Sequence, residues 1–318
     1  MTSEEAIVAA GLDWEVEKRE IFTKSAGPDG GMMLVPDHFS IVRMTDDKPL
    51  GVVGSRYTAL QNKDAFRFFD ELVGEKEAIY ETAGSLRGGK IIWIMSKLPG
   101  CIGSVEDPIE QWLVLSNAHD GSRKVSVMAT PIRVVCMNTL NAAIGTASSN
   151  YEMTHTSGIF ERIVDAREAL GMVTQYFERM GDVLNVMKTR SLTDVERKSY
   201  VYALFPMKVK SEQSPDGLEE MLNAEISSRM KVYVEKMFEL LESGKGTDLP
   251  GVKGTVYGAF NTACEFADHW KPVRGENNDP LSRKLDSIWF GSAAKFKQTA
   301  FNYALGMIDK PGDIPTAE

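Results

Sequence analysis

The residues whose types could do chemistry are concentrated in one stretch of the chain, Ser116–Ala143. His119 and Asp120 stand side by side, and Cys136 follows. A thiol beside a base and an orienting carboxylate is the arrangement of cysteine nucleophiles. A structural interpretation competes with this one, because Asp120 precedes a glycine at a hairpin turn and Cys136 lies in the apolar run IRVVCM. We favour the structural interpretation and keep a hydrolase centred on His119, Asp120 and Cys136 as the alternative.

Cations near aromatic residues form the second group with chemical potential. Arg87 and Lys90 flank a glycine-rich turn, and Arg123 and Lys124 follow the Asp-Gly turn. Single-stranded nucleic acid is bound by such mixtures of backbone charge and stacking. The expected start of a helix at Asn138 would add a phosphate site. The residues that we expect to contact nucleic acid are therefore Arg87, Lys90, Arg123, Lys124, Arg133, Asn138 and Thr139.

Composition narrows the function classes. The chain has 318 residues, is 43% hydrophobic and carries a formal net charge of -9, which argues against a broadly cationic DNA coat but allows a local basic groove. Its three cysteines are widely spaced, and neither CxxC nor HxxxH occurs, so we predict no disulfide framework, no metal and no cofactor. The acidic beginning and the absence of a long apolar run predict a cytoplasmic protein without a membrane span.

Two hairpins must position the candidate residues. AIYETAGSL and KIIWIMSKL surround Arg87-Gly88-Gly89, and QWLVLSNAH and RKVSVMATPIRVV surround Asp120-Gly121. Turn glycines between β-branched and aromatic runs predict antiparallel pairs over residues 78–145. CMNTLNAAIG then predicts a helix that opens near Asn138-Thr139. We expect an α+β fold with a β-β-β-α-like core, in which helices pack on an antiparallel sheet.

The flanking segments predict mostly helix, except for two short strands that end at Tyr57 and surround a turn at Asp46-Asp47-Lys48-Pro49. Residues 1–20 have an acidic helical pattern, and Asn62 is a candidate N-cap of a helix ending at Gly74. Thr193 to Glu196 resembles a capping box within a largely helical region from 158 to 310. The organisation that we predict is an α+β domain over 1–150 and a helical region over 151–318. Four cations near the end of the chain suggest a solvated basic helix face: Arg283, Lys284, Lys295 and Lys297.

Several blocks of sequence resemble a known family. GVVGSRYTALQN, ETAGSLRGGKIIWIMSKLP, NAHDGSRK…PIRVVCMNTL and GTVYGAFNTACEFADHW occur in the order found in the phage- and plasmid-associated family called domain of unknown function 932. The resemblance implies a mobile-element protein in a bacterial host cell, and it implies no reaction. The expected topology also resembles that of recombination single-strand annealing proteins, which are oligomers that hold single-stranded DNA in a basic groove.

The function that we predict is non-enzymatic binding of single-stranded DNA in recombination or replication, by a homo-oligomer. The alternatives are the hydrolase and a phage protein that binds a host protein. We also expect His119, Arg133 and Asn138 to stabilise the structure, with Arg133 hydrogen-bonded to loop carbonyls or a carboxylate.

Overall fold

The computed structural model describes residues 3–27, 30–67, 70, 79–140, 150–157, 166–205, 228–273 and 279–308. The chain divides into two compact units, and each is built from three separate stretches. Unit 1 comprises Met1–Gly100, Gln111–Thr130 and Ala147–Tyr176, and unit 2 comprises Cys101–Glu110, Pro131–Thr146 and Phe177–Glu318. The division of the chain into folding domains near residue 150 stays a prediction.

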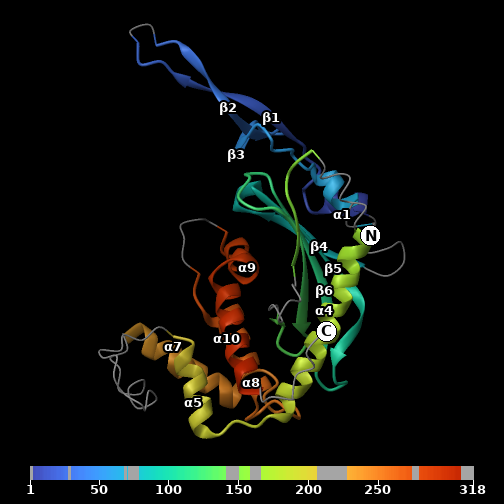
Figure 1. The fold of residues 1–318 in the computed structure, drawn as a ribbon, viewed down its shortest axis with the longest axis vertical. Coiled ribbons are helices and arrows are strands. Elements are labelled where there is room, and N and C mark those ends of the chain that lie inside the picture. The colour runs from blue at the N-terminus through green and yellow to red at the C-terminus, as the bar shows by residue number, and fades with distance from the viewer. Residues whose placement is uncertain are drawn as a thin grey trace. The chain divides into compact units, whose positions relative to one another are not determined.

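Unit 1 begins with a short helix and a three-stranded antiparallel sheet. Its elements are α1 (Ser3–Ala9), β1 (Val16–Lys24), β2 (Met32–Arg43) and β3 (Lys48–Gly54), and the strand order is β1-β2-β3. Figure 1 shows β1 and β2 as a long ribbon. The helix expected over residues 1–20 is wrong beyond α1, because Gly11 adopts a φ of 63° and Val16 pairs with Arg43. Lys18 and Arg19 therefore lie on a strand.

The second sheet contains the two hairpins. Its strands are β4 (Ile79–Leu86), β5 (Ile91–Gly103), β6 (Pro108–Ala118), β7 (Val125–Arg133), β8 (Asn138–Thr139) and β9 (Asn150–Met153), in the order β4-β5-β6-β7-β8, with β9 also on β7. β4 and β5 are antiparallel around the turn at Arg87–Gly89, where Gly88 has a φ of 69°. β6 and β7 are neighbours around Gly121, whose φ is 71°. The predicted hairpins and the α+β class are confirmed.

The helix expected at Asn138-Thr139 is wrong. These two residues form β8, in which Asn138 pairs with Arg133 and Thr139 with Ile132. Met137 enters the reversal with a φ of 57°, and its N–H donates to the carbonyl of Arg133 at 2.8 Å. Backbone pairing with β7 is therefore favoured over the helix that the local pattern predicts. The end of the expected helix, residues 141–145, lies outside the described residues.

Helices supply most of unit 2. The elements are α4 (Ala166–Thr189, which begins in unit 1), α5 (Asp194–Ala203), α7 (Ser228–Ser243), α8 (Val256–Glu265), the π-helical turn η3 (Phe266–Trp270), α9 (Pro280–Phe290) and α10 (Ser292–Ile308). The predicted capping box is confirmed, because Thr193 and Glu196 exchange side-chain and backbone hydrogen bonds at the start of α5. α8 is buried along its whole length. Among the described helices, none is long and apolar enough to cross a membrane.

Candidate functional site: a basic recess and two buried ionic clusters

Arg87 and Lys90 stay at the β4–β5 turn. Arg87 is exposed and Lys90 is half-buried. Two hydrogen bonds fix the backbone of this turn. Nζ of Lys48 donates to the carbonyl of Gly88 at 2.9 Å, and the N–H of His119 donates to the carbonyl of Lys90 at 2.8 Å. Arg87 and Lys90 therefore lie on a turn of unit 1 whose backbone is fixed by hydrogen bonds.

Arg123 and Lys124 line a recess of about 750 Å³ in unit 1, together with residues from three other segments. We call it the unit 1 recess, and its charged and aromatic lining residues are Asp37, His38, Arg56, Tyr57, Arg123, Lys124 and His155. Sequence reasoning missed Arg56, which lies 67 positions before Arg123 and which no local motif connects to the hairpin turn. Arg87 and Lys90 are not among the residues that line it.

The charges of the unit 1 recess are mostly positive. The lining contains three cations, Arg56, Arg123 and Lys124, and one carboxylate, that of Asp37. Lys124 also pairs with Glu152 at 2.9 Å, with both side chains well exposed. An exposed pair of this kind is worth about 0–1 kcal/mol, so a phosphate can compete for the ammonium group.

An aromatic pair adjoins these cations. The rings of Tyr57 and His155 are stacked with centroids 4.6 Å apart and an interplanar angle of 24°. Burial lowers the pKa of His155, so its ring is neutral at pH 7, while Nδ1 lies 3.3 Å from the carbonyl oxygen of Thr58. The hydroxyl of Tyr57 donates to the carbonyl of Ala118 at 2.8 Å. The pair is therefore fixed in place beside the recess.

His119 is a buried structural residue of unit 1. Its Nε2 lies 2.8 Å from Oδ1 of Asn62, and its ring contacts Trp14 with centroids 5.2 Å apart. The amide nitrogen of Asn62 donates to the carbonyls of Leu12 and Trp14, so Oδ1 is the acceptor and Nε2 of His119 carries the proton. Burial lowers the pKa of His119 to about 3, and the nearby His155 adds to the effect. The N-cap role expected for Asn62 is wrong, because Asn62 is already helical and its side chain joins two other segments instead.

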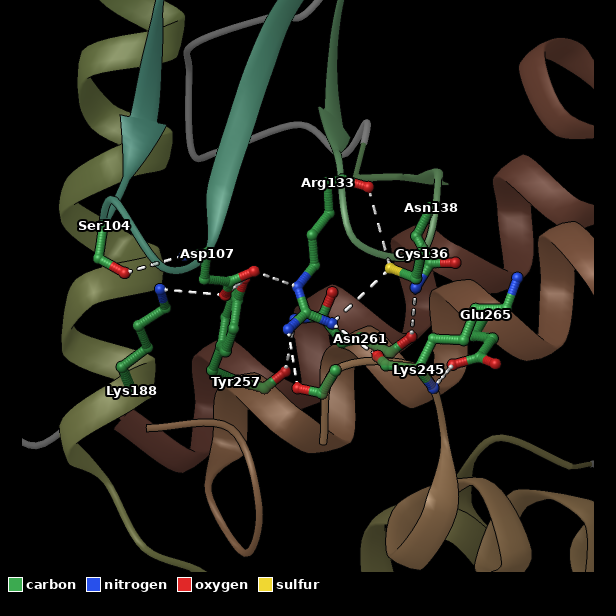
Figure 2. Close-up of polar contacts among 11 residues, drawn as sticks. Ser104, Asp107, Arg133, Cys136, Asn138, Lys188, Lys245, Tyr257, Asn261 and Glu265 are labelled. Carbon is green, nitrogen blue, oxygen red and sulfur yellow. Dashed lines mark hydrogen bonds and ion pairs between the residues drawn. The ribbon is translucent and has the colours of Figure 1, made fainter. Parts of the chain in front are cut away.

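Arg133 lies at the centre of a buried ionic cluster in unit 2 (Figure 2). Its side chain is 1% exposed, and Nε donates to Oδ1 of Asp107 at 2.6 Å. Nη1 and Nη2 donate to the carbonyls of Lys245 and Gly246 at 3.1 and 3.0 Å. The expectation that Arg133 bonds a carboxylate and loop carbonyls is confirmed. A side chain so enclosed offers no surface to a nucleic acid.

Asp107 has two further partners. Nζ of Lys188 lies 3.2 Å from its Oδ2, and the hydroxyl of Tyr257 donates to the same oxygen at 2.7 Å. Burial acts to raise the pKa of Asp107, but hydrogen bonds from Arg133 and Tyr257 and the charges of Arg133 and Lys188 outweigh it, so the pKa lies below its usual value. The carboxylate is consequently ionised, and we call Asp107, Arg133, Lys188 and Tyr257 the Arg133 cluster.

Cys136 adjoins the Arg133 cluster as a protonated thiol. Its sulfur is buried and lies 3.7 Å from Nη1 of Arg133. Burial raises the pKa of the thiol, and the charge of Arg133 only partly opposes this effect. A nucleophilic cysteine needs a thiolate and a base within reach. The hydrogen bonds of this sulfur are with Arg133 and with the backbone of Asn138, neither of which is a base, and this supports the structural interpretation.

Asn138 and Thr139 belong to the interior of unit 2. Asn138 is buried, and its amide donates to the carbonyl of Asn261 at 3.3 Å. Thr139 donates its N–H and its hydroxyl to Oδ2 of Asp268, at 2.8 and 2.7 Å. Lys297 is fully buried, lies 2.9 Å from Oδ1 of Asp268 and contacts the hydroxyl of Thr139. The solvated face expected for Lys297 is therefore wrong, because Asp268 compensates its charge in the core.

The arrangement defines an α+β protein that combines a cationic recess with ionic clusters buried in its helical unit. Within the described residues, no three His, Cys, Asp or Glu side chains are grouped so that they could hold a metal ion. The chain belongs to the family described as Domain of unknown function (DUF932), whose family model matches residues 49–289. No curated protein and no solved structure matches the chain.

Proposed function

We propose that this protein binds single-stranded nucleic acid through the unit 1 recess, without catalysing a reaction. The observation that carries the proposal is the convergence of Arg56, Arg123 and Lys124 with the Tyr57–His155 stack around about 750 Å³ of open volume. Cations that neutralise phosphates, next to aromatic rings on which bases stack, are the two components of single-strand binding. The phage and plasmid association that the sequence resemblance implies is the reason for proposing a role in recombination or replication.

The salt dependence of binding follows from the number of cations. Each phosphate neutralised on a single strand contributes about -0.7 to the slope of log affinity against log salt. Three recess cations therefore predict a slope of about -2. Arg133 adds nothing to this sum, because it is 1% exposed and paired with Asp107. The formal net charge of -9 opposes any broader attraction of phosphate, so affinity is modest.

The test compares two charge reversals in unit 1. The recess variant carries Arg123→Glu and Lys124→Glu, and the control carries Lys63→Glu and Arg67→Glu, which are exposed and do not line the recess. Each variant replaces one lysine and one arginine, so the change in net charge is identical. Lys18 is unsuitable for a control, because it donates to the carbonyl of Tyr57 at 3.0 Å and so contacts a recess residue.

Fluorescence anisotropy with a labelled oligothymidine, over a series of salt concentrations, measures the affinity and its slope. We expect the recess variant to bind at least tenfold more weakly than the control, and an unlabelled single strand to compete better than a duplex. Absence of binding at low salt, or equal losses in both variants, would refute the proposal. Sedimentation of the same samples tests the predicted self-association.

A further inference from the structure

Unit 2 contains a second pocket, separate from its buried ionic clusters. It has a volume of about 400 Å³ and is lined by Arg229 and Tyr233 of α7, by Lys271–Val273 after η3, and by residues of α9 and the start of α10. We call it the unit 2 pocket. Its volume lies within the range of about 300–1,000 Å³ that is typical of small-molecule sites.

Cations outnumber carboxylates in the lining. Arg229, Lys271 and Arg283 contribute positive charges, and Asp286 contributes one negative charge. The guanidinium of Arg229 donates to the hydroxyl of Tyr233, from Nε at 3.0 Å and from Nη2 at 2.9 Å. The hydroxyl of Tyr233 is a neutral partner that orients the guanidinium of Arg229.

A lysine pair beside the pocket has neutral partners as well. Nζ of Lys271 donates to the carbonyl of Ser292 at 3.2 Å, and Nζ of Lys284 donates to those of Ala267 and Lys271 at 3.2 and 2.9 Å. Burial lowers the pKa of both ammonium groups, and the charge of Lys284 lowers that of Lys271 further. The charge of Asp268 acts to raise the pKa of Lys284 and so partly offsets the effect of burial, although the same carboxylate pairs with Lys297. Two mutually repelling, half-buried cations are stabilised by an added anion.

We propose that the unit 2 pocket binds a phosphate-bearing small molecule through Arg229, Lys271 and Arg283. A guanidinium is suited to phosphate because its donors form a planar fork that matches two oxygens. Among the lining residues, Ser292 begins α10 and Gly291 directly precedes it, and the amide end of this 17-residue helix adds partial positive charge. The inference is independent of the unit 1 recess, because no residue lines both cavities.

Calorimetric titration with sodium pyrophosphate, at ionic strength held constant with sodium chloride, tests the proposal. The variant is Arg229→Gln, and the matched control is Lys231→Gln, an exposed cation on the same helix that does not line the pocket. Loss of one charge-assisted contact predicts affinity weaker by roughly tenfold to a hundredfold in Arg229→Gln. The control is expected to bind like the wild type. Because Arg229 is exposed, the variant is expected to fold, which its melting curve verifies.

A competition experiment distinguishes the sources of the phosphate. A nucleoside triphosphate that displaces pyrophosphate while oligothymidine does not would identify a free nucleotide-like ligand, as we expect. Displacement by oligothymidine, with weaker oligothymidine binding in Arg229→Gln, would assign the phosphate to a nucleic-acid backbone and overturn the small-molecule proposal. Absence of saturable pyrophosphate binding, or equal weakening by Arg229→Gln and Lys231→Gln, would overturn the site itself. The Arg123→Glu, Lys124→Glu protein, changed in the unit 1 recess, is expected to bind pyrophosphate normally, so the two proposals can fail separately.

Discussion

Replacement of Arg133 by methionine tests whether the Arg133 cluster stabilises the fold. The substitution keeps a long side chain but removes the charge and every donor of the guanidinium. Asp107 would lose its 2.6 Å contact, and the carbonyls of Lys245 and Gly246 would lose their donors. Because these groups cannot all reach water from the interior, we expect a substantial fall in the free energy of unfolding.

The geometry of the cluster sets the size of that fall. Breaking a buried ion pair by removing one partner costs about 3–5 kcal/mol. Asp107 would retain Lys188 and Tyr257, so we expect Arg133→Met to cost about 3 kcal/mol, the lower end of that range. Asp107→Asn leaves Arg133 buried without its carboxylate, and about 4–5 kcal/mol is expected. Lys188, with 14% of its side chain exposed, can be hydrated more readily, so Lys188→Met should cost about 1 kcal/mol.

Urea unfolding followed by circular dichroism measures these differences. The expected order of destabilisation is Asp107→Asn, then Arg133→Met, then Lys188→Met. Equal effects of Arg133→Met and Lys188→Met would refute the reasoning, because burial is what separates them. An unchanged midpoint in Arg133→Met together with lost oligonucleotide binding would assign Arg133 to a binding site instead.

Three further predictions concern single residues. The pKa of His119 is about 3 in the fold and about 6.5 in the unfolded chain. The free energy of unfolding is therefore expected to fall as the pH drops from about 6.5 toward 3, by up to about 1.4 kcal/mol per pH unit. Urea titrations at several pH values measure this dependence, and His119→Gln should flatten it. Gly51→Ala would place a Cβ 2.4 Å from Cα of Asp120, which should cost about 1–3 kcal/mol of stability. The control Gly54→Ala meets no atom within 4 Å and should leave the melting temperature nearly unchanged. Equal melting temperatures of the two variants would contradict the packing argument. Thr193→Ala removes the capping box of α5 and should cost about 1 kcal/mol in unfolding experiments, and an unaltered stability would show that the cap is dispensable.

Local chemistry was sufficient to predict the hairpins and the cap. The turns at Arg87–Gly89 and around Gly121 need positive φ angles, which glycine adopts without strain, and the structure has them. The Thr193–Glu196 capping box likewise depends on four consecutive residues. Such features are decided within a few residues, so a sequence pattern is enough to find them.

The misassigned segments show where local pattern fails. Residues 16–20 belong to the helical pattern of residues 1–20, yet β2 supplies a partner strand for them. Asn138-Thr139 resembles a helix start, yet β7 and Asp268 satisfy its donors. Lys297 looks like part of a solvated face, yet Asp268, 29 positions earlier, neutralises it in the core. In each case the partner lies outside the window in which propensity is read.

The sequence by itself determined the family, the α+β class, the hairpin turns and the presence of Arg123 and Lys124 beside one of them. Tertiary structure alone decided which polar residues are accessible. It brought Arg56 to the recess that Arg123 and Lys124 line, and it paired Arg133 with Asp107 and Lys297 with Asp268 in the interior of unit 2. The physical reason is that burial and charge compensation depend on contacts between residues far apart in the chain, and no spacing within a strand or helix encodes them.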